Sequence, residues 1–176
     1  MVIDVSWVKL PKTKFEQLKN GTKGVVFRLS PQYVAKILYS TKGPEENPDY
    51  SLRENHGAVK ELDYECEINH KLFEAGIGNV PRPMGIERLR LYDTAYPAFI
   101  MEYLQIPRAD ELGFVDLGKA KELAKQEFGK AIDIGLLPGR DALNPGNYFY
   151  DPKSSLVRLI DFGRWEYDPD FVPESV

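Results

Sequence analysis

The sequence predicts an α+β fold of two lobes, the second of them small and mainly helical. Short apolar runs typical of strands dominate the first half of the 176-residue chain, and one helical pattern lies among them. A second helical pattern and a pair of short strands follow in the second half. We therefore expect a first lobe of residues 1–104, a second of residues 105–176, and a crossover at residues 105–112.

The length and composition fit a single globular domain. Charged residues make up 28% of the chain and apolar residues 43%, which excludes a disordered chain or a coiled-coil rod. No apolar run approaches the ~20 residues of a membrane span, and the start lacks the pattern of a secretory signal. A net charge of −4 argues against nucleic acid as the main partner. We expect a cytoplasmic protein with no membrane partner.

The first half is predicted to be mostly strands. Alternating apolar residues at 3–7 indicate one strand. Two longer apolar runs, 24–29 and 33–38, are separated by Ser30-Pro31-Gln32, which predicts a hairpin. The stretch 40–57 is polar and holds two prolines and two glycines, so we expect a loop there.

A helix is predicted at residues 58–75, because apolar residues recur three and four positions apart and Gly76 ends the pattern. Two strands are predicted next, at 84–91 and 98–103, with a turn at 93–95 between them.

The second half begins with a helical pattern for which Asp116 is the expected N-cap and Gly135 the expected stop. Two short strands, 148–150 and 156–160, follow and are joined by a turn. This strand pair is predicted to close the fold.

Two oxygen-bearing side chains are expected to meet at the ends of this strand pair. Asp161 follows the second strand, and Asn147 directly precedes the first. A hairpin returns its ends to one place, and a carboxylate beside an amide oxygen is a reasonable ligand pair for Mg²⁺. In isolation, both Asp161-Phe162-Gly163 and Asn144-Pro145-Gly146 also fit ordinary turns.

Lys36 lies inside the apolar strand Val34-Ala35-Lys36-Ile37-Leu38, where a charge is costly to bury without a partner. Glu65 on the following helix is the expected partner, because its neighbours one turn away on the helix are apolar. Glu67 has polar neighbours and is expected to be solvated. Taken alone, Lys36 is also compatible with an edge strand and a side chain that reaches water.

A strand that ends in Met101-Glu102-Tyr103-Leu104 leads into the crossover, where its backbone groups are placed to contact a flat heterocycle. By itself this is an ordinary strand end. This strand end follows the glycine-containing hairpin, the lysine strand and the Glu65 helix along the chain, and Asp161-Phe162-Gly163 comes after it. Taken together in this order, the features resemble the protein-kinase-like superfamily over residues 18–166. The sequence looks most similar to compact members such as RIO-type kinases and aminoglycoside-phosphotransferase-like enzymes.

The resemblance implies a kinase-like fold, with a five-stranded antiparallel sheet and one helix in the first lobe. It also implies that ATP and Mg²⁺ bind, with Lys36 on the α- and β-phosphates and Glu65 orienting it. Asn147 and Asp161 would hold Mg²⁺. The other implied nucleotide-binding residues are Gly21 and Gly24 in the glycine loop, Met101 as gatekeeper, and Glu102 and Leu104 as backbone contacts to adenine.

The candidate catalytic loop departs from the family spacing. The family places its base Asp five residues before the Asn, whereas Asp141 lies six before Asn147 and Arg140 replaces the usual His. Either the loop absorbs the extra residue and Asp141 acts as the base, or Asp141 points elsewhere and no base is present.

We expect a Mg²⁺- and ATP-dependent phosphotransferase acting on a protein or on itself. The alternative is a pseudokinase that binds a nucleotide or a partner protein without catalysis.

Thirteen residues follow Gly163, so we expect this sequence to lack the helices that dock peptide substrates in the family. A peptide substrate would then need another docking surface or a partner protein. The apolar residues at 132–137 either remain exposed as an interaction face or are covered by the last residues folding back, with Trp165, Tyr167 and Phe171.

Overall fold

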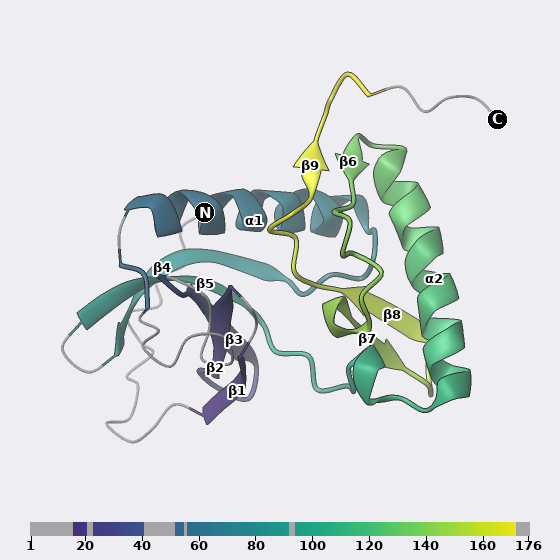
Figure 1. Cartoon of the computed structure of the whole chain (residues 1–176), viewed down its shortest axis with the longest axis horizontal. Helices are drawn as coiled ribbons and strands as arrows, with labels where there is room; N and C mark the ends of the chain where they lie inside the picture. Colours follow the sequence, from purple (N-terminus) through teal and green to yellow (C-terminus); the bar gives the residue numbers. More distant parts are fainter. Residues whose placement is uncertain (1–15, 21–22, 41–51, 55, 92–93, 172–176) are drawn as a thin grey trace. The chain divides into compact units, whose positions relative to one another are not determined.

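The structure, a computed structural model, describes residues 16–20, 23–40, 52–54, 56–91 and 94–171. The expected strand at 3–7 and residues 41–51 and 55 of the expected loop at 40–57 lie outside these ranges. The chain forms two compact units (Figure 1). The first is Met1–Cys66 with Pro83–Tyr103, and the second is Glu67–Arg82 with Leu104–Val176. The second unit thus includes residues 67–82, which precede the predicted lobe boundary.

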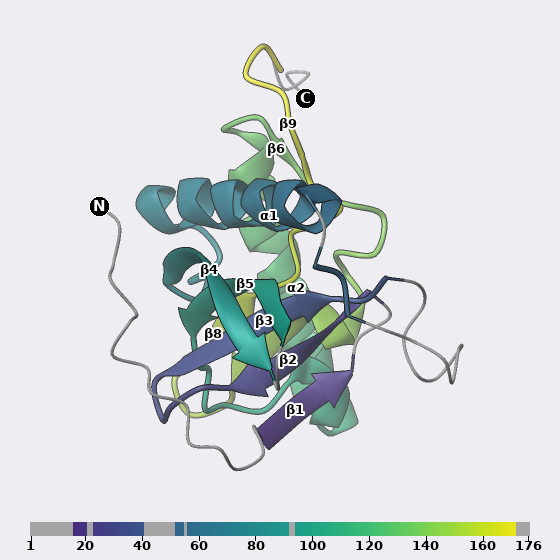
Figure 2. The ribbon, with the colours of Figure 1, turned by 90° about the vertical axis from the view of Figure 1, so that its left-hand side faces the viewer.

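The first unit is built on a five-stranded antiparallel sheet of spatial order β1-β2-β3-β5-β4, which confirms the predicted sheet (Figure 2). Its strands are β1 (Glu16–Asn20), β2 (Gly24–Arg28), β3 (Tyr33–Leu38), β4 (Pro83–Leu91) and β5 (Thr94–Glu102). The predicted turn between β2 and β3 is present, and the Ser30 hydroxyl accepts hydrogen bonds from the backbone N–H of Gln32 and Tyr33. Strand β1 was not predicted, because its sequence EQLKN lacks an apolar alternation.

Strand β3 separates two apolar clusters. Ala35 and Ile37 belong to one cluster, whereas Leu38 packs with Phe99 of β5 and Leu62 of helix α1 (His56–Ala75) in the other. Side chains alternate along a strand, so Lys36 shares the face of Leu38, toward α1. The position of a charged side chain on this face follows from the two-residue period of the strand.

The second unit contains helix α2 (Phe114–Ile132) and short strands and turns. Its strands form two antiparallel pairs, β6 (Leu136–Leu137) with β9 (Glu166–Tyr167) and β7 (Tyr148–Asp151) with β8 (Leu156–Leu159). Two single-turn 3₁₀ helices, η1 (Ala109–Glu111) and η2 (Pro145–Asn147), complete the unit, which also includes residues 67–75 of α1.

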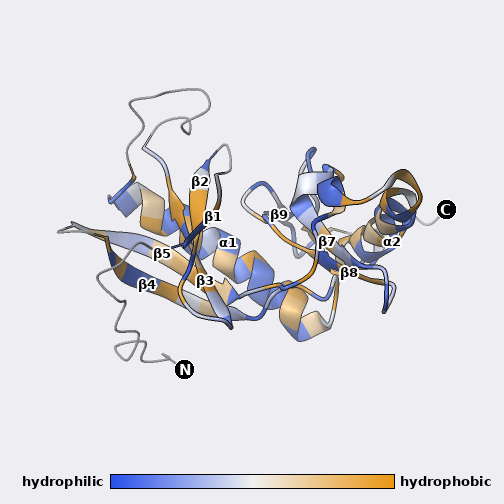
Figure 3. Cartoon of the chain, turned by 90° about the horizontal axis from the view of Figure 1, so that it is seen from below, coloured by the Kyte–Doolittle hydropathy of each residue, from blue (hydrophilic) through white to orange (hydrophobic). Residues whose placement is uncertain are grey.

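Helix α2 begins two residues before the predicted cap. Its N-cap is Gly113 in an extended conformation, and Asp116 lies in the first turn, so the prediction that Asp116 caps the helix is wrong. The carboxylate of Asp116 in the first turn still interacts favourably with the positive end of the helix dipole. The helix carries both polar and apolar positions along its length (Figure 3). Among the described residues, no helix combines the length and apolar character needed to cross a membrane.

The core of the second unit is closed by the segment that follows Gly163. Trp165 is buried and meets the rings of Phe128 and Phe162 edge-on, with centroids 5.6 and 5.4 Å apart. Strand β9 pairs with β6, and Leu136 is fully buried. Of the two alternatives for residues 132–137, the folded-back chain is therefore confirmed for Leu136, while Ile134 remains exposed.

Candidate functional site

The first unit holds a buried ion pair between Lys36 and Glu65. The Nζ atom of Lys36 donates to both carboxylate oxygens of Glu65, at 2.7 and 2.9 Å. The two side chains are 13% and 5% exposed. The expected ion pair is thus present, and the alternative of a solvated edge-strand lysine is wrong because β3 is a central strand of the sheet.

The helix face explains why Glu65, rather than Glu67, pairs with Lys36. Leu62 and Ile68 lie three residues to either side of Glu65, and both are fully buried. Glu67 is exposed and lies 3.6 Å from Lys71 one turn along the same helix, as its predicted solvation requires. The periodicity of α1 alone therefore selects the partner of the buried lysine.

The predicted adenine-contacting segment lies at the end of β5. In the register of the sheet, Met101 faces Val34 and Glu102 faces Tyr33. Met101 is partly buried against the cluster that contains Leu38 and Phe99. Leu104 is buried and belongs to the second unit. The roles of Met101, Glu102 and Leu104 as gatekeeper and adenine contacts stay predictions.

The predicted glycine loop is described in part. Gly21 lies outside the described residues. Gly24 starts β2, and a Cβ atom there would lie 2.4 Å from the carbonyl oxygen of Ile37 on β3. The close approach of two strands is therefore sufficient to require glycine at position 24, independently of any bound phosphate.

In the second unit the hairpin β7–β8 brings Asn147 and Asp161 together. The backbone N–H of Ile160 donates to the carbonyl of Asn147 at 3.0 Å, which places Asp161 one residue from this contact. The side-chain amide nitrogen of Asn147 donates to the carbonyl of Asp141 at 2.9 Å. Because the nitrogen has this partner, the amide oxygen is the atom of Asn147 available to a cation.

Asp161 has an unusual backbone conformation, with a φ of +62°. Side chains other than glycine seldom adopt this left-handed region, although Asp and Asn tolerate it better than most. Strained backbone of this kind is found preferentially at functional sites, where the surrounding structure holds it in place. The Asp161 side chain is exposed. The prediction that it ligates Mg²⁺ is compatible with this position.

Asp141 forms an ion pair that the sequence did not predict. Its Oδ2 lies 2.9 Å from Nη1 of Arg164. Its carbonyl accepts from the backbone N–H of Asn144 as well as from the side-chain amide of Asn147, so residues 141–147 form a compact turn. Arg164 was missed because a single arginine in a short polar segment carries no periodic or motif signal.

Cys66 is a half-buried free cysteine whose surroundings disfavour the thiolate. Burial and the neighbouring Asp63 and Glu65 carboxylates raise the pKa of its thiol to about 11. The thiolate is the reactive form of cysteine, so Cys66 stays protonated and inert near neutral pH. Among the described residues, no group of three His, Cys, Asp or Glu side chains is arranged to hold a metal.

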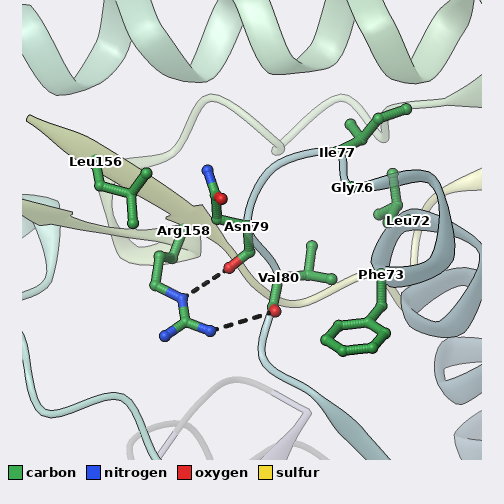
Figure 4. Close-up of a pocket in the computed structure, with 8 residues that line it drawn as sticks. All are labelled: Leu72, Phe73, Gly76, Ile77, Asn79, Val80, Leu156 and Arg158. Carbon is green, nitrogen blue, oxygen red and sulfur yellow. Dashed lines mark hydrogen bonds between the residues drawn. The ribbon is translucent and has the colours of Figure 1, made fainter.

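A small pocket of about 240 Å³ lies in the second unit, between the end of α1 and β8 (Figure 4). It is lined mainly by apolar residues, and none of the predicted site residues contributes to it. Arg158 donates to the backbone carbonyls of Asn79 and Val80, so its guanidinium fastens the loop after α1 to β8. We read the pocket as a consequence of packing rather than as the candidate site.

The fold is similar to that of a protein with kinase activity. A solved structure of the bifunctional kinase-methyltransferase WbdD matches with a TM-score of 0.53 and 17% identity, over 91% of this chain and 36% of that chain. A co-crystal structure of WbdD with the kinase inhibitor LY294002 matches with a TM-score of 0.51 and 17% identity, over 88% and 33%. The chain therefore spans about a third of the length of these structures. No model of a protein family and no curated protein matches the chain.

Proposed function

We propose that the chain is a Mg²⁺- and ATP-dependent phosphotransferase that acts on a protein or on itself. The observation that carries the proposal is the buried Lys36–Glu65 ion pair. Burying two opposite charges in place of apolar residues is a poor way to gain stability, since the desolvation cost offsets their attraction. A lysine held in this way inside a sheet of kinase-like topology has the charge and the fixed position to bind a phosphate.

The proposal assigns the polar residues of each unit a separate task. Lys36, oriented by Glu65, would contact the α- and β-phosphates. Asn147 and Asp161 would hold Mg²⁺, and they fit it because an amide oxygen and a carboxylate are the hard oxygen donors that this ion prefers. When bound, the ion would neutralise the charge of the phosphates.

Asp141 is the proposed general base. The oxygen of an acceptor hydroxyl attacks the γ-phosphorus, and the bond between this phosphorus and the bridging β–γ oxygen breaks with its electron pair leaving on ADP. The proton of the hydroxyl passes to the Asp141 carboxylate. Phosphoryl transfer relies mainly on positioning and charge stabilisation, so loss of the base slows transfer, by about 10²–10⁴-fold, without abolishing it.

We further place the chain among compact kinase-like proteins similar to RIO-type kinases or aminoglycoside-phosphotransferase-like enzymes, active in the cytoplasm. The support for this placement is a resemblance of the loop 141–147: in these families the loop ends in Pro-Gly-Asn, and here Pro145 and Gly146 directly precede Asn147. In the structure these residues form the η2 turn, where the Asn144 side chain accepts from the N–H of Gly146 at 3.0 Å.

A pseudokinase is the alternative function, and the Asp141–Arg164 ion pair is the observation that favours it. A carboxylate already bound to a guanidinium resembles a structural salt bridge as much as a base. This reading predicts that Asp141→Asn leaves the turnover of ATP unchanged, whereas the phosphotransferase reading predicts a loss.

The first experiment is a melting-temperature measurement of the full chain with Mg-ATP, with ATP and EDTA, and without nucleotide. Ligand at about 100 times its dissociation constant contributes about 2.7 kcal/mol, which raises the melting temperature of a chain of this size by roughly 5–10 °C. We expect this rise with Mg-ATP and a smaller one with EDTA. The Asp133→Ala variant is the control for loss of an aspartate and should show the same rise as the wild type, because Asp133 is exposed at the end of α2 and has no role in the proposed site. An unchanged melting temperature at saturating Mg-ATP would refute nucleotide binding.

A further inference from the structure

The candidate base Asp141 is linked to the segment that follows Asp161. Nη1 of Arg164 lies 2.9 Å from Oδ2 of Asp141, and the two side chains are 56% and 36% exposed. Arg164 comes three residues after Asp161, and Asp141 precedes Asn147 in the loop before β7. Two segments that carry candidate site residues are therefore joined by one ion pair.

The backbone beneath this ion pair is held closely in place. A Cβ atom on Gly139 would lie 2.6 Å from the carbonyl oxygen and 2.9 Å from the Cβ of Arg164, so the two segments touch where position 139 has no side chain. The next residue, Trp165, is buried and its N–H donates to the carbonyl of Phe162 at 3.0 Å. The backbone and Cβ of Arg164 are thus held in place by the core of the second unit.

Two separate sets of contacts hold Asp141. Its carbonyl accepts hydrogen bonds from the side chain of Asn147 and the backbone of Asn144, both at 2.9 Å. Its carboxylate is held by Arg164 through Oδ2, and Oδ1 has no partner within the described part of the chain. An ion pair as exposed as this contributes little to stability. Its main physical effect is therefore on the orientation of the carboxylate.

We propose that Arg164 is a positioning residue for Asp141, an inference that rests on the phosphotransferase function proposed above. Arg164 holds Oδ2 and turns Oδ1 toward the acceptor hydroxyl, whose proton Oδ1 takes during transfer. This contact supplies the orientation in a loop that is one residue longer than the family spacing. Arg164 touches neither the acceptor nor the nucleotide, and it acts through Asp141.

The test measures ADP formation by the purified full chain with Mg-ATP as the one added ligand, so that water or the chain itself is the acceptor. Because a displacement of about 1 Å in a catalytic group costs up to about 10²-fold, we expect Arg164→Ala to lower kcat by about tenfold and to leave KM for ATP unchanged. Arg164→Lys, which restores a cation, recovers part of the rate. In an Asp141→Asn background, Arg164→Ala has no further effect, since the two residues act as a unit.

Arg140→Ala is the matched control. Arg140 is an exposed arginine next to Asp141, with no ion pair among the described residues, so its removal changes the local charge equally and spares the contact. If Arg140→Ala and Arg164→Ala lower kcat alike, or if their effects add to that of Asp141→Asn, the positioning role is wrong. A wild type that forms no ADP although Mg-ATP raises its melting temperature refutes both catalysis and this role. If the wild type forms ADP and Arg164→Ala has the same kcat, the positioning role of Arg164 is refuted while the proposed phosphotransferase function stands.

Discussion

The two units each carry an ion pair at a candidate site, and the two pairs differ in burial. Lys36 and Glu65 lie between a central strand and a helix, almost fully removed from water. Asp141 and Arg164 lie on exposed turns of the second unit. The first pair cannot lose a member without leaving a charge in an apolar environment, whereas either member of the second is readily solvated. Substitution at Lys36 is therefore expected to change stability together with any binding role, whereas substitution at Asp141 is expected to leave stability nearly unchanged.

The largest effect is expected from Lys36→Ala. It leaves the Glu65 carboxylate buried without its cation, and breaking such a pair costs about 3–5 kcal/mol. Urea unfolding of the variant measures this loss. The double variant Lys36→Met with Glu65→Leu removes both charges and is expected to regain most of the stability. A loss below about 1 kcal/mol in the single variant would mean that the pair behaves like an exposed one.

Asp161→Asn tests the second unit. In contrast to Lys36→Ala, this variant is expected to lose Mg-ATP binding and to keep nearly all of its stability. Asparagine tolerates the positive φ at this position and keeps the shape of the side chain, but it removes the charge. We expect the melting temperature without nucleotide to stay near that of the wild type. The rise of roughly 5–10 °C expected with Mg-ATP should largely disappear. A full rise in the variant would exclude Asp161 as a metal ligand.

Asn69 on α1 sharpens the comparison of buried polar groups, because its side chain, in contrast to that of Glu65, is buried with no partner among the described residues. It is 1% exposed, and within the described part of the chain neither Nδ2 nor Oδ1 has a hydrogen-bond partner. Replacing an unsatisfied buried group by an apolar one of similar shape removes a penalty of about 1–3 kcal/mol. We therefore expect Asn69→Leu to raise the unfolding free energy. A decrease would contradict the interpretation of Asn69 as an unsatisfied buried group.

The smallest effect is expected at Asp151, an exposed carboxylate in the β7–β8 turn. The Ser154 hydroxyl donates to it at 2.7 Å and the Lys153 N–H at 3.0 Å, and these hydrogen bonds lower its pKa. A lowered folded-state pKa contributes stability above the unfolded pKa of about 3.9, and this contribution is lost as pH falls through the folded value. The stability difference between wild type and Asp151→Asn should therefore shrink between neutral pH and about pH 2. A constant difference would contradict the assignment.

Periodic and other short-range patterns in the sequence were sufficient to predict the features that depend on a single strand, helix or turn. The two-residue period of β3 placed Lys36 on the face of the sheet toward α1, and the helical period selected Glu65 over Glu67. The turn between β2 and β3 and the approach of Asn147 to Asp161 also followed from short-range signals. Their roles toward ATP and Mg²⁺ remain predictions, because charge and position do not identify a ligand.

Tertiary packing decided what short-range signals do not encode. The start of α2 at Phe114 depends on the extended backbone of Gly113 rather than on a capping side chain, which is why Asp116 was the wrong choice. The pairing of β6 with β9 spans two residues on each strand, too few for any periodic pattern to show.

The sequence by itself determined the α+β class of the fold, the strand that carries Lys36 and the choice of Glu65 as the partner of this lysine, since these depend on patterns within single elements. That the strand lies inside the sheet rather than at its edge was decided by the tertiary structure. Only the tertiary structure decided how the chain after Gly163 is used. Trp165 fills the core between Phe128 and Phe162, and this packing brings Arg164 to Asp141. Contacts between residues far apart in the sequence depend on how side chains fill the space between elements, which no single-element pattern records.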